Sequence, residues 1–391
     1  MDLPIELVAL SDEQQQIVDL CRRFAADELR PRAREVDEDD NGPGRETAWD
    51  VWRRAQEVGV GSFMLPAELG GGGFTDVLTQ CLAQEELAAG DLGLANLVTS
   101  NGFFADPVLE LGTPEQQRRW LTPLCGPDAP MTALAVTEPG VGSDAASLTT
   151  RAVRHGDRYL LTGQKAWISN AGAADLYVVF AKTDPAAGAR GVTAFVVGKD
   201  APGLTFGEPM KKMGQRAIVN REMFLDQVPV PASDRLGDEG QGFYGLMRTF
   251  DISRTVLGSS AVGCARAAFE VARDYARTRT QFGRPIIEHQ AVGFRLADMK
   301  TRIDSARLMV WRSARRLDLG LDATESSAQA KLVASETAMW CTWAAVQTLG
   351  GWGYSREYLV EKWMRDAKLE EIEEGTSDIQ RLVIARSIGR G

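Results

Sequence analysis

Histidine and paired cysteine are scarce in this chain of 391 residues. There are two histidines, His155 and His289, and the five cysteines are scattered without a C-x-x-C pair. A zinc site, a Ser-His-Asp triad or a Cys-His dyad would need one of those histidines, and we assign neither a catalytic role. We therefore expect no metal site, and we expect acid–base chemistry to depend on carboxylates. Dispersed cysteines are typical of small buried thiols in a reducing compartment.

Long apolar runs and an excess of positive charge are also missing. No segment is apolar enough to span a bilayer, and the N-terminus is acidic, without a basic leader. We therefore expect a cytoplasmic protein that does not bind membranes. Lys and Arg number 44 against 54 for Asp and Glu, giving a net charge of -10. This balance argues against a nucleic-acid binder, which needs a positive surface.

What is present indicates three successive parts, helical, β-rich and helical again. Residues 1–130 are predicted to form an N-terminal α-helical domain, 131–240 a middle antiparallel β domain and 241–391 a C-terminal helical bundle. Apolar residues recur near a 3.6-residue spacing in the first and last parts. Between 152 and 224, short β-rich runs follow one another without an intervening amphipathic helix, which favours antiparallel over parallel pairing.

Several element ends can be predicted individually. Ser11 and Gln14 fit a capping box at the start of the first helix, and Pro31 indicates a change of direction. The C-terminal part predicts long helices over 243–279, 290–319 and 326–349 and a short one over 379–388. Long helices joined by short loops are typical of a bundle.

The segment from Gly140 to Ala145 has the pattern G-x-G-x-x-A after an apolar run. One interpretation is a Rossmann phosphate loop in an NAD enzyme, but that fingerprint requires a helix next, within a βαβ unit. Here the following residues indicate a hairpin. The remaining interpretations are a plain turn, or a loop whose N–H groups approach a flavin or phosphate.

Two further constellations have both structural and functional interpretations. Gly350, Gly351 and Gly353 follow a long helix and can form an ordinary C-cap or a loop that holds a pyrophosphate. Four glutamates lie within residues 370–374. Such a run is usually a solvated face, but it ends at Gly375, where Glu374 could project into a cleft as a general base.

Five motifs, in this order, resemble the acyl-CoA dehydrogenase family over nearly the whole chain. They are AVTEPGVGSD (135–144), KAWISN (165–170), RTQFGRPI (279–286), QTLGGWGYSREYLVEKWMRD (347–366) and EEGTSDIQR (373–381). The resemblance implies an N-terminal helical domain, a middle antiparallel β-barrel and a C-terminal four-helix bundle, assembled as a homotetramer. It also implies bound FAD, an acyl-CoA substrate and electron transfer to an electron-transfer flavoprotein.

The resemblance assigns the FAD contacts to matching positions. Part of the set would line the flavin ring: Val136, Thr137, Gly142, Ser143, Trp167, Ile168 and Ser169. The ADP half would be contacted from an adjacent subunit, with Thr376 and Asp378 completing the site: Arg279, Gln281, Phe282, Gln347, Gly350 and Gly351. The substrate positions are Ser143, Asp251, Arg254, Glu373 and Gly375.

Catalysis in the family combines α-proton abstraction by a carboxylate with hydride transfer from the β-carbon to flavin N5, giving a trans-2-enoyl-CoA. Glu374 matches the catalytic base, and its N–H would help to hold the thioester oxygen. Some relatives carry the base just before the arginine that matches Arg254, and that position is Ser253 here. Glu373 stands where Tyr is common, and Glu370 is also unusual. Both glutamates could be solvated and inert, or Glu373 could make the acyl pocket polar or raise the pKa of Glu374.

Two alternatives remain beside the dehydrogenase. One is an oxygen-reactive acyl-CoA oxidase or flavin monooxygenase with the same fold. The other is a non-catalytic CoA-binding helical assembly, because a fold alone does not establish an activity.

Overall fold

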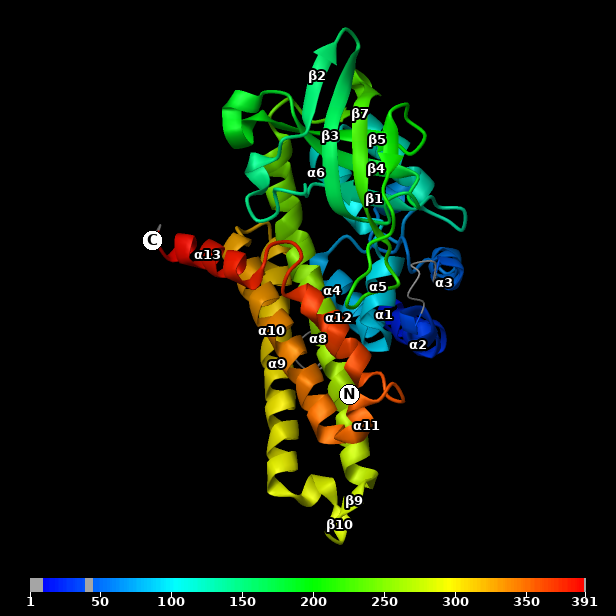
Figure 1. Cartoon of the computed structure of the whole chain (residues 1–391), viewed down its shortest axis with the longest axis vertical. Helices are drawn as coiled ribbons and strands as arrows, with labels where there is room; N and C mark the ends of the chain where they lie inside the picture. Colours follow the sequence, from blue (N-terminus) through cyan, green and yellow to red (C-terminus); the bar gives the residue numbers. More distant parts are fainter. Residues whose placement is uncertain (1–9, 39–44, 390–391) are drawn as a thin grey trace.

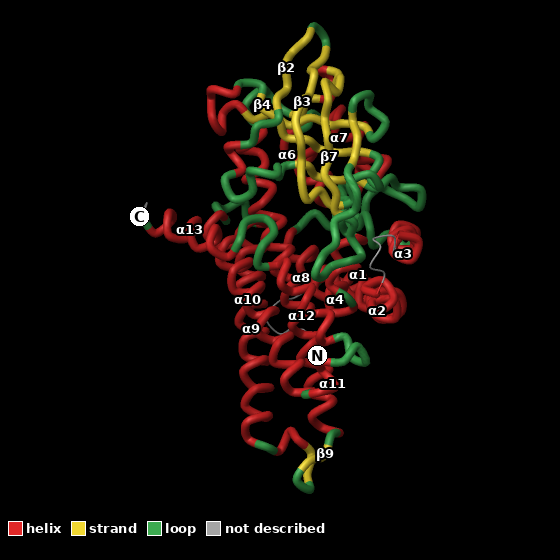
Figure 2. The backbone as a smooth tube through the Cα atoms, in the orientation of Figure 1, coloured by secondary structure: helices red, strands yellow, loops and turns green. Residues whose placement is uncertain are grey.

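The computed structural model describes residues 10–38 and 45–389. The sheet lies at one end of the elongated molecule, and the long helices extend from it to the opposite end, where the β9–β10 hairpin lies (Figure 1). The strands of the main sheet gather at one end together with α6 and α7, whereas the long helices of the bundle occupy the rest of this axis (Figure 2). The predicted order of a helical part, a sheet and a second helical part is confirmed.

Seven helices form the N-terminal part of the described chain: α1 (Asp12–Phe24), α2 (Arg30–Glu38), α3 (Arg45–Glu57), α4 (Val77–Gly90), α5 (Leu92–Val98), α6 (Gly102–Leu111) and α7 (Pro114–Leu121). The capping box at α1 is confirmed, because Ser11 Oγ accepts from the Gln14 N–H while the Gln14 side chain accepts from the Ser11 N–H. The expected change of direction at Pro31 is wrong. A wider π-helical turn, Ala25–Leu29, leads α1 directly into α2.

Every residue of helix α4 is buried except the partly buried Gln80. Glu85 Oε1 pairs with Arg307 Nη2 at 2.8 Å, and Glu86 Oε2 pairs with Arg266 Nη2 at 2.7 Å. Because breaking one partner of a buried ion pair costs about 3–5 kcal/mol, these contacts fix α4 against α8 and α9. This position makes α4 one wall of the cavity described below.

The middle part contains the eight strands of the main sheet: β1 (Thr132–Ala135), β2 (Arg151–His155), β3 (Arg158–Ser169), β4 (Leu176–Lys182), β5 (Val192–Gly198), β6 (Leu204–Phe206), β7 (Asn220–Pro231) and β8 (Arg235–Leu236). Their order is β6-β7-β3-β2-β4-β5-β8, with β1 beside β4. Most neighbours are antiparallel, as predicted, whereas β1 pairs with β4 in parallel and β2 meets β4 through a single parallel pair. Within the described residues, this path ends at β6 and β8 without a closing pair.

The C-terminal part contains α8 (Gly242–Thr278), β9 (Thr280–Gln281), β10 (Arg284–Pro285), α9 (Gln290–Asp318), α10 (Thr324–Leu349), α11 (Gly351–Tyr354), α12 (Val360–Glu370) and α13 (Ser377–Ile388). Helices α8, α9, α10 and α12 pack together as the bundle. The four predicted helices are confirmed to within about two residues at each end. Sequence reasoning from the residues missed α12, whose buried Lys362 pairs with Asp366 at 2.7 Å and with Asp91.

Some features are absent from the described ranges. No helix there is both long and apolar enough to cross a membrane. No group of three or more His, Cys, Asp or Glu side chains in 10–38 and 45–389 is arranged to hold a metal ion. The five cysteines are free thiols, and all except the partly buried Cys125 are buried.

Candidate active site

Glu374 lies in the turn between α12 and α13, where the backbone has an unusual conformation. Its φ is 51° and that of Gly375 is 97°, so two consecutive residues adopt the left-handed region. This region suits glycine but strains a residue with a side chain. Arg254 Nε donates to the Glu374 carbonyl at 3.0 Å, and Lys331 Nζ donates to that of Gly375 at 2.9 Å. These bonds hold the strained turn against the bundle.

The carboxylate of Glu374 has one bound and one unpartnered oxygen. Oε2 accepts a hydrogen bond of 2.7 Å from the Ser253 hydroxyl on α8, whereas Oε1 is buried without a partner among the described residues. Burial raises the pKa of Glu374, and the Ser253 hydrogen bond and the charges of Arg254 and Lys331 oppose this rise. The backbone N–H of Glu374 likewise donates no hydrogen bond within the described ranges. A free oxygen and a free N–H at one residue can act as a proton acceptor and an oxyanion donor.

Glu370 and Glu373 are not the solvated pair that the glutamate run suggested. Glu370 is 1% exposed and accepts from Gln215 Nε2 at 2.8 Å, and Glu373 is partly buried. Burial and then the charge of Glu374 raise the pKa of Glu373 to about 7, and burial also raises that of Glu370. Each carboxyl leaves one buried oxygen without a donor, and the two groups interact directly. We interpret the pair as holding one proton between the two carboxyls, which would give both oxygens a partner.

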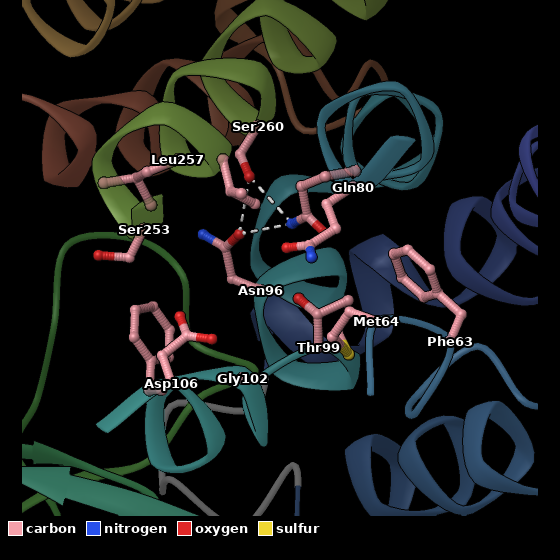
Figure 3. Close-up of a pocket in the computed structure, with 13 residues that line it drawn as sticks. Phe63, Met64, Gln80, Asn96, Thr99, Gly102, Asp106, Ser253, Leu257 and Ser260 are labelled. Atoms are coloured by element: carbon pink, nitrogen blue, oxygen red, sulfur yellow. Dashed lines mark hydrogen bonds between the residues drawn. The ribbon is translucent and has the colours of Figure 1, made fainter. Parts of the chain in front are cut away.

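A cavity of about 60 Å³ lies between α4, α5, α6 and α8 (Figure 3). Its residues are Phe63, Met64, Gln80, Gln84, Asn96, Thr99, Gly102, Phe103, Asp106, Ser253, Val256, Leu257 and Ser260. The cavity reaches Ser253, the residue whose hydroxyl binds Glu374. Thr99, which follows α5, is also part of the lining. Glu373 is not among the residues that line this cavity, and its effect on the polarity of the acyl pocket stays a prediction.

One buried ion pair and its hydrogen bonds hold the segment that follows β1. Lys165 Nζ lies 2.9 Å from Glu138 Oε1 and donates to the carbonyl of Val136 at 2.9 Å. The Glu138 carboxylate also accepts from the N–H and hydroxyl groups of Thr149 and Thr150. Together they lower the pKa of Glu138 to about 2. These contacts fix the path of residues 136–143 as the chain leaves the sheet. This segment contains the predicted flavin contacts Val136, Thr137, Gly142 and Ser143.

The predicted contacts Trp167, Ile168 and Ser169 lie at an irregularity in β3. The register with β7 shifts between Lys165 and Ile168, and Trp167 has a φ of 61°. The Trp167 side chain is 60% exposed, although it lies next to the buried Ile168. Asn220 Nδ2 donates to Trp167 O at 3.1 Å and to Ser169 Oγ at 3.2 Å, which fixes this bulge. An exposed indole on a fixed backbone can stack against a planar ring such as isoalloxazine.

The interpretation of residues 140–145 as a Rossmann loop is wrong. Val141 forms a bridge with Glu138, and a short 3₁₀ turn at Ala145–Ser147 leads to β2, which pairs with β3 as a hairpin. A dinucleotide fingerprint requires a βαβ unit here, and the chain forms none at this place. The same segment remains available for close backbone approach to a ligand.

The substrate positions Asp251 and Arg254 lie on α8. Arg254 is 6% exposed, and its Nη1 is 3.9 Å from Asp251 Oδ1. Asp251 accepts from Thr324 Oγ1 at 2.9 Å and Ser327 Oγ at 3.1 Å, and burial raises its pKa. Arg254 therefore connects the predicted CoA positions to the Glu374 turn, whereas Ser143 lies in the exposed signature loop.

A single chain does not bring the predicted ADP contacts to the flavin loop. Arg279, Gln281 and Phe282 lie at the β9–β10 hairpin, at the end of the bundle opposite the sheet (Figure 1). Gln347, Gly350 and Gly351 lie at the end of α10, and Thr376 and Asp378 lie at the start of α13. These residues are exposed apart from Thr376, which is partly buried, and Phe282 is 93% exposed. The separation agrees with contacts made from another subunit, which stays a prediction.

One residue of the site was missed by sequence reasoning. Asp106 lies within α6 and lines the cavity, and burial together with the charge of Glu374 raises its pKa to about 7. In the sequence it is one acid in an apolar segment, GFFADPVLEL. The sequence does show an isolated acid between apolar residues. That this acid lines the cavity becomes evident only from the packing of α6 on α8.

The fold and this site define an enzyme of the acyl-CoA dehydrogenase family, to which the chain belongs. Three family models match it: the acyl-CoA dehydrogenase N-terminal domain over residues 11–127, the middle domain over 133–228 and the C-terminal domain over 240–389. The family resemblance seen in the sequence is therefore confirmed, as is FAD as the cofactor of this class.

Particular relatives place the chain within this family. It is 41% identical over 380 residues to cyclohex-1-ene-1-carbonyl-CoA dehydrogenase of Geobacter metallireducens, covering 97% of this chain and 98% of the relative. A solved structure of butyryl-CoA dehydrogenase from Megasphaera elsdenii matches with a TM-score of 0.91 and 37% identity over 100% of both chains. A structure described as the electron transferring flavoprotein of Acidaminococcus fermentans matches with a TM-score of 0.92, 37% identity and full coverage of both chains.

Proposed function

We propose that this enzyme removes two hydrogens from the α- and β-carbons of a short acyl-CoA thioester and produces a trans-2-enoyl-CoA. The observation that carries the proposal is the state of Glu374. Its Oε1 is buried and unpartnered, its N–H is free within the described chain, and its hydroxyl partner Ser253 lines a cavity. Burial raises the pKa of Glu374, which brings a carboxylate closer to the range useful for a general base.

The α-proton of the substrate is accepted at Glu374 Oε1 in this account. The negative charge that grows on the thioester oxygen is stabilised by the backbone N–H of Glu374, an arrangement of the oxyanion type. Ser253 and Arg254 hold the carboxylate and its carbonyl, so the base does not have to be ordered during the reaction. Bound FAD supplies the acceptor for the hydride that leaves the β-carbon.

The FAD would lie on the segment 136–143 and the β3 bulge at 167–169. The fixed backbone and the exposed Trp167 side chain support this placement. Arg279, Gln281, Phe282, Gln347 and the glycines after α10 would contact the ADP half from a neighbouring subunit. Ser143, Asp251, Arg254 and the backbone of Gly375 would contact the CoA thioester.

We propose a homotetramer that passes electrons to an electron-transfer flavoprotein. Phe282, a predicted inter-subunit position, is 93% exposed, and Trp352, the residue after the predicted position Gly351, is 50% exposed. These exposed apolar side chains support an assembly that covers them. The structural match to the Acidaminococcus flavoprotein structure supports an electron-transfer partner of that kind. A cytoplasmic location stays a prediction.

The test is a screen of acyl-CoA esters with an artificial electron acceptor, beside anaerobic mixing that follows the flavin absorbance. We expect a short acyl-CoA to bleach the flavin and air to reoxidise it slowly. Rapid oxygen consumption by the reduced enzyme would instead favour an oxidase or monooxygenase. A purified protein that takes up no FAD would support the non-catalytic assembly.

A further inference from the structure

Asp106 contributes the single ionisable side chain among the thirteen residues that line the cavity. It lies on α6, while Ser253 and Leu257 lie on α8 across the same space (Figure 3). The apolar part of the cavity wall is formed by Phe63, Met64, Phe103, Val256 and Leu257. A carboxylate therefore faces a mostly apolar space with no cation in its lining.

The carboxylate of Asp106 makes no hydrogen bond or ion pair with any residue in 10–38 or 45–389. It lies in the middle of α6, which spans Gly102–Leu111, so it does not cap that helix either. The Asp106 side chain is partly buried, and withdrawing a carboxylate from water without a partner is costly unless the group becomes neutral. Burial and the charge of Glu374 accordingly raise the pKa of Asp106 to about 7. No contact among the described residues stabilises a carboxylate at this position.

The other polar groups of the cavity already have partners in the protein. Gln84 Nε2 donates to Asn96 Oδ1 at 3.1 Å and to Ser260 Oγ at 2.9 Å, and Ser260 donates to Asn96 Oδ1 at 3.1 Å. The Thr99 hydroxyl donates to the carbonyl of Ala95 at 2.9 Å. The hydrogen bond between Ser260 and Asn96 is drawn as a dashed line in the cavity wall (Figure 3). Among the lining residues, Asp106 is thus the one that offers a charged acceptor to a ligand.

The cavity also limits the length of what it can hold. A volume of about 60 Å³ corresponds to a few water-sized groups, since one such group needs about 10–15 Å³ on this measure. The matching ligand is a short chain with apolar sides and one hydrogen-bond donor at its far end.

We propose that Asp106 is a specificity-determining residue that accepts a hydrogen bond from a hydroxyl or ammonium group at the far end of a short acyl chain. This inference rests on the proposed function, because the cavity is taken as the acyl site of a dehydrogenase. It narrows the substrate class from short acyl-CoA esters to those that carry a donor beyond the β-carbon.

The test uses the FAD-loaded enzyme and ester pairs in which a terminal methyl is replaced by a donor of similar size. One pair is pentanoyl-CoA and 4-hydroxybutanoyl-CoA, and the other is hexanoyl-CoA and 5-aminopentanoyl-CoA. We expect kcat/KM of the wild-type enzyme to favour the donor in at least one pair by tenfold or more. The pair that shows the preference distinguishes a hydroxyl from an ammonium ligand.

Substitutions distinguish the contribution of Asp106 to substrate preference from that of the other residues of the cavity. Asp106→Leu is expected to reverse the preference, and Asp106→Asn to keep part of it for the hydroxyl but lose it for the ammonium. Glu110→Gln is the matched control, because Glu110 lies one turn further along α6 and pairs with Arg248 outside the cavity. It should leave both ratios unchanged.

An equal or greater kcat/KM for the alkyl member of both pairs in the wild-type enzyme would overturn the inference, whether or not the variants fold. A donor preference that survives unchanged in Asp106→Leu would also overturn it. Failure of the proposed function is a different result, in which neither alkyl nor donor-bearing esters reduce the flavin of the wild-type enzyme.

Discussion

The Ser253 hydroxyl donates a 2.7 Å hydrogen bond to Glu374 Oε2. Ser253 is on α8 and Glu374 follows α12, so the bond joins two helices of the bundle across 121 positions of sequence. It stabilises the ionised carboxylate and holds the pKa of Glu374 below the value that burial alone would give. The position that we expect to carry the base in some relatives thus carries a hydroxyl that binds the proposed base here.

Ser253→Ala should raise the pKa of Glu374, because it removes a hydrogen bond to the charged form. A hydrogen bond to a charged group contributes about 1.5–3 kcal/mol, and one pKa unit is 1.36 kcal/mol. We expect the acid limb of the rate of flavin reduction to move up by about one pH unit. Single-turnover mixing across pH measures this. Thr249→Ala is the control, because Thr249 bonds within α8 to Gly245; an equal shift there would contradict the account.

Glu370→Gln should stabilise the protein at alkaline pH. In the folded state the pKa of Glu373 is raised to about 7, and that of Glu370 is also raised. In the unfolded state a glutamate loses its proton above about pH 4.3. The folded state therefore keeps protons that the unfolded state has released. Stability is therefore lost as the pH rises through that window. Glutamine keeps the acceptor for Gln215 and presents a donor to Glu373.

Thermal unfolding at pH 5 and pH 8.5 measures this effect. We expect little change at pH 5 and a gain on the order of 1 kcal/mol at pH 8.5. Glu371→Gln is the control, since that side chain forms a surface contact with Lys368. A variant less stable than the wild type at pH 8.5 would show that the two carboxyls do not share a proton.

Trp167→Phe should remove much of the fluorescence quenching that accompanies FAD binding. The side chain is 60% exposed at the bulge that we assign to the flavin, so its emission should respond to a ring placed beside it. Titration of the apo-protein with FAD measures the amplitude. Trp120→Phe is the comparison, because Trp120 lies on α7 and stacks with Arg119. Equal quenching in both variants would place the flavin elsewhere.

Local rules predicted the long helices and the capping box because their signals lie within a few residues of each other. Sequence reasoning missed α12, whose buried Lys362 pairs with Asp366 and Asp91. Asp91 is 271 positions away in the sequence, so no local pattern reports this contact. It also gave even weight to a solvated interpretation of Glu370, whose burial depends on Gln215 and Asn96 in other parts of the chain.

The site residues that lie in a sequence motif could be predicted. Those that reach the site only through the packing of distant segments could not. The turn at Glu374 and Gly375 was found from its motif, but its strained φ and its bonds to Arg254 and Lys331 required the fold. Asp106 could not be assigned, because a lone acid has no periodic or spacing signal that reports which cavity it faces.

The most direct test of the central claim is anaerobic flavin reduction by a short acyl-CoA in Glu374→Gln, followed in the stopped-flow instrument. Glutamine is nearly isosteric and cannot accept the α-proton. We predict normal FAD content and substrate binding with flavin reduction slowed by at least a thousandfold, in line with the loss of general base catalysis at a positioned group. Reduction at the wild-type rate, with the same FAD content, would contradict the account.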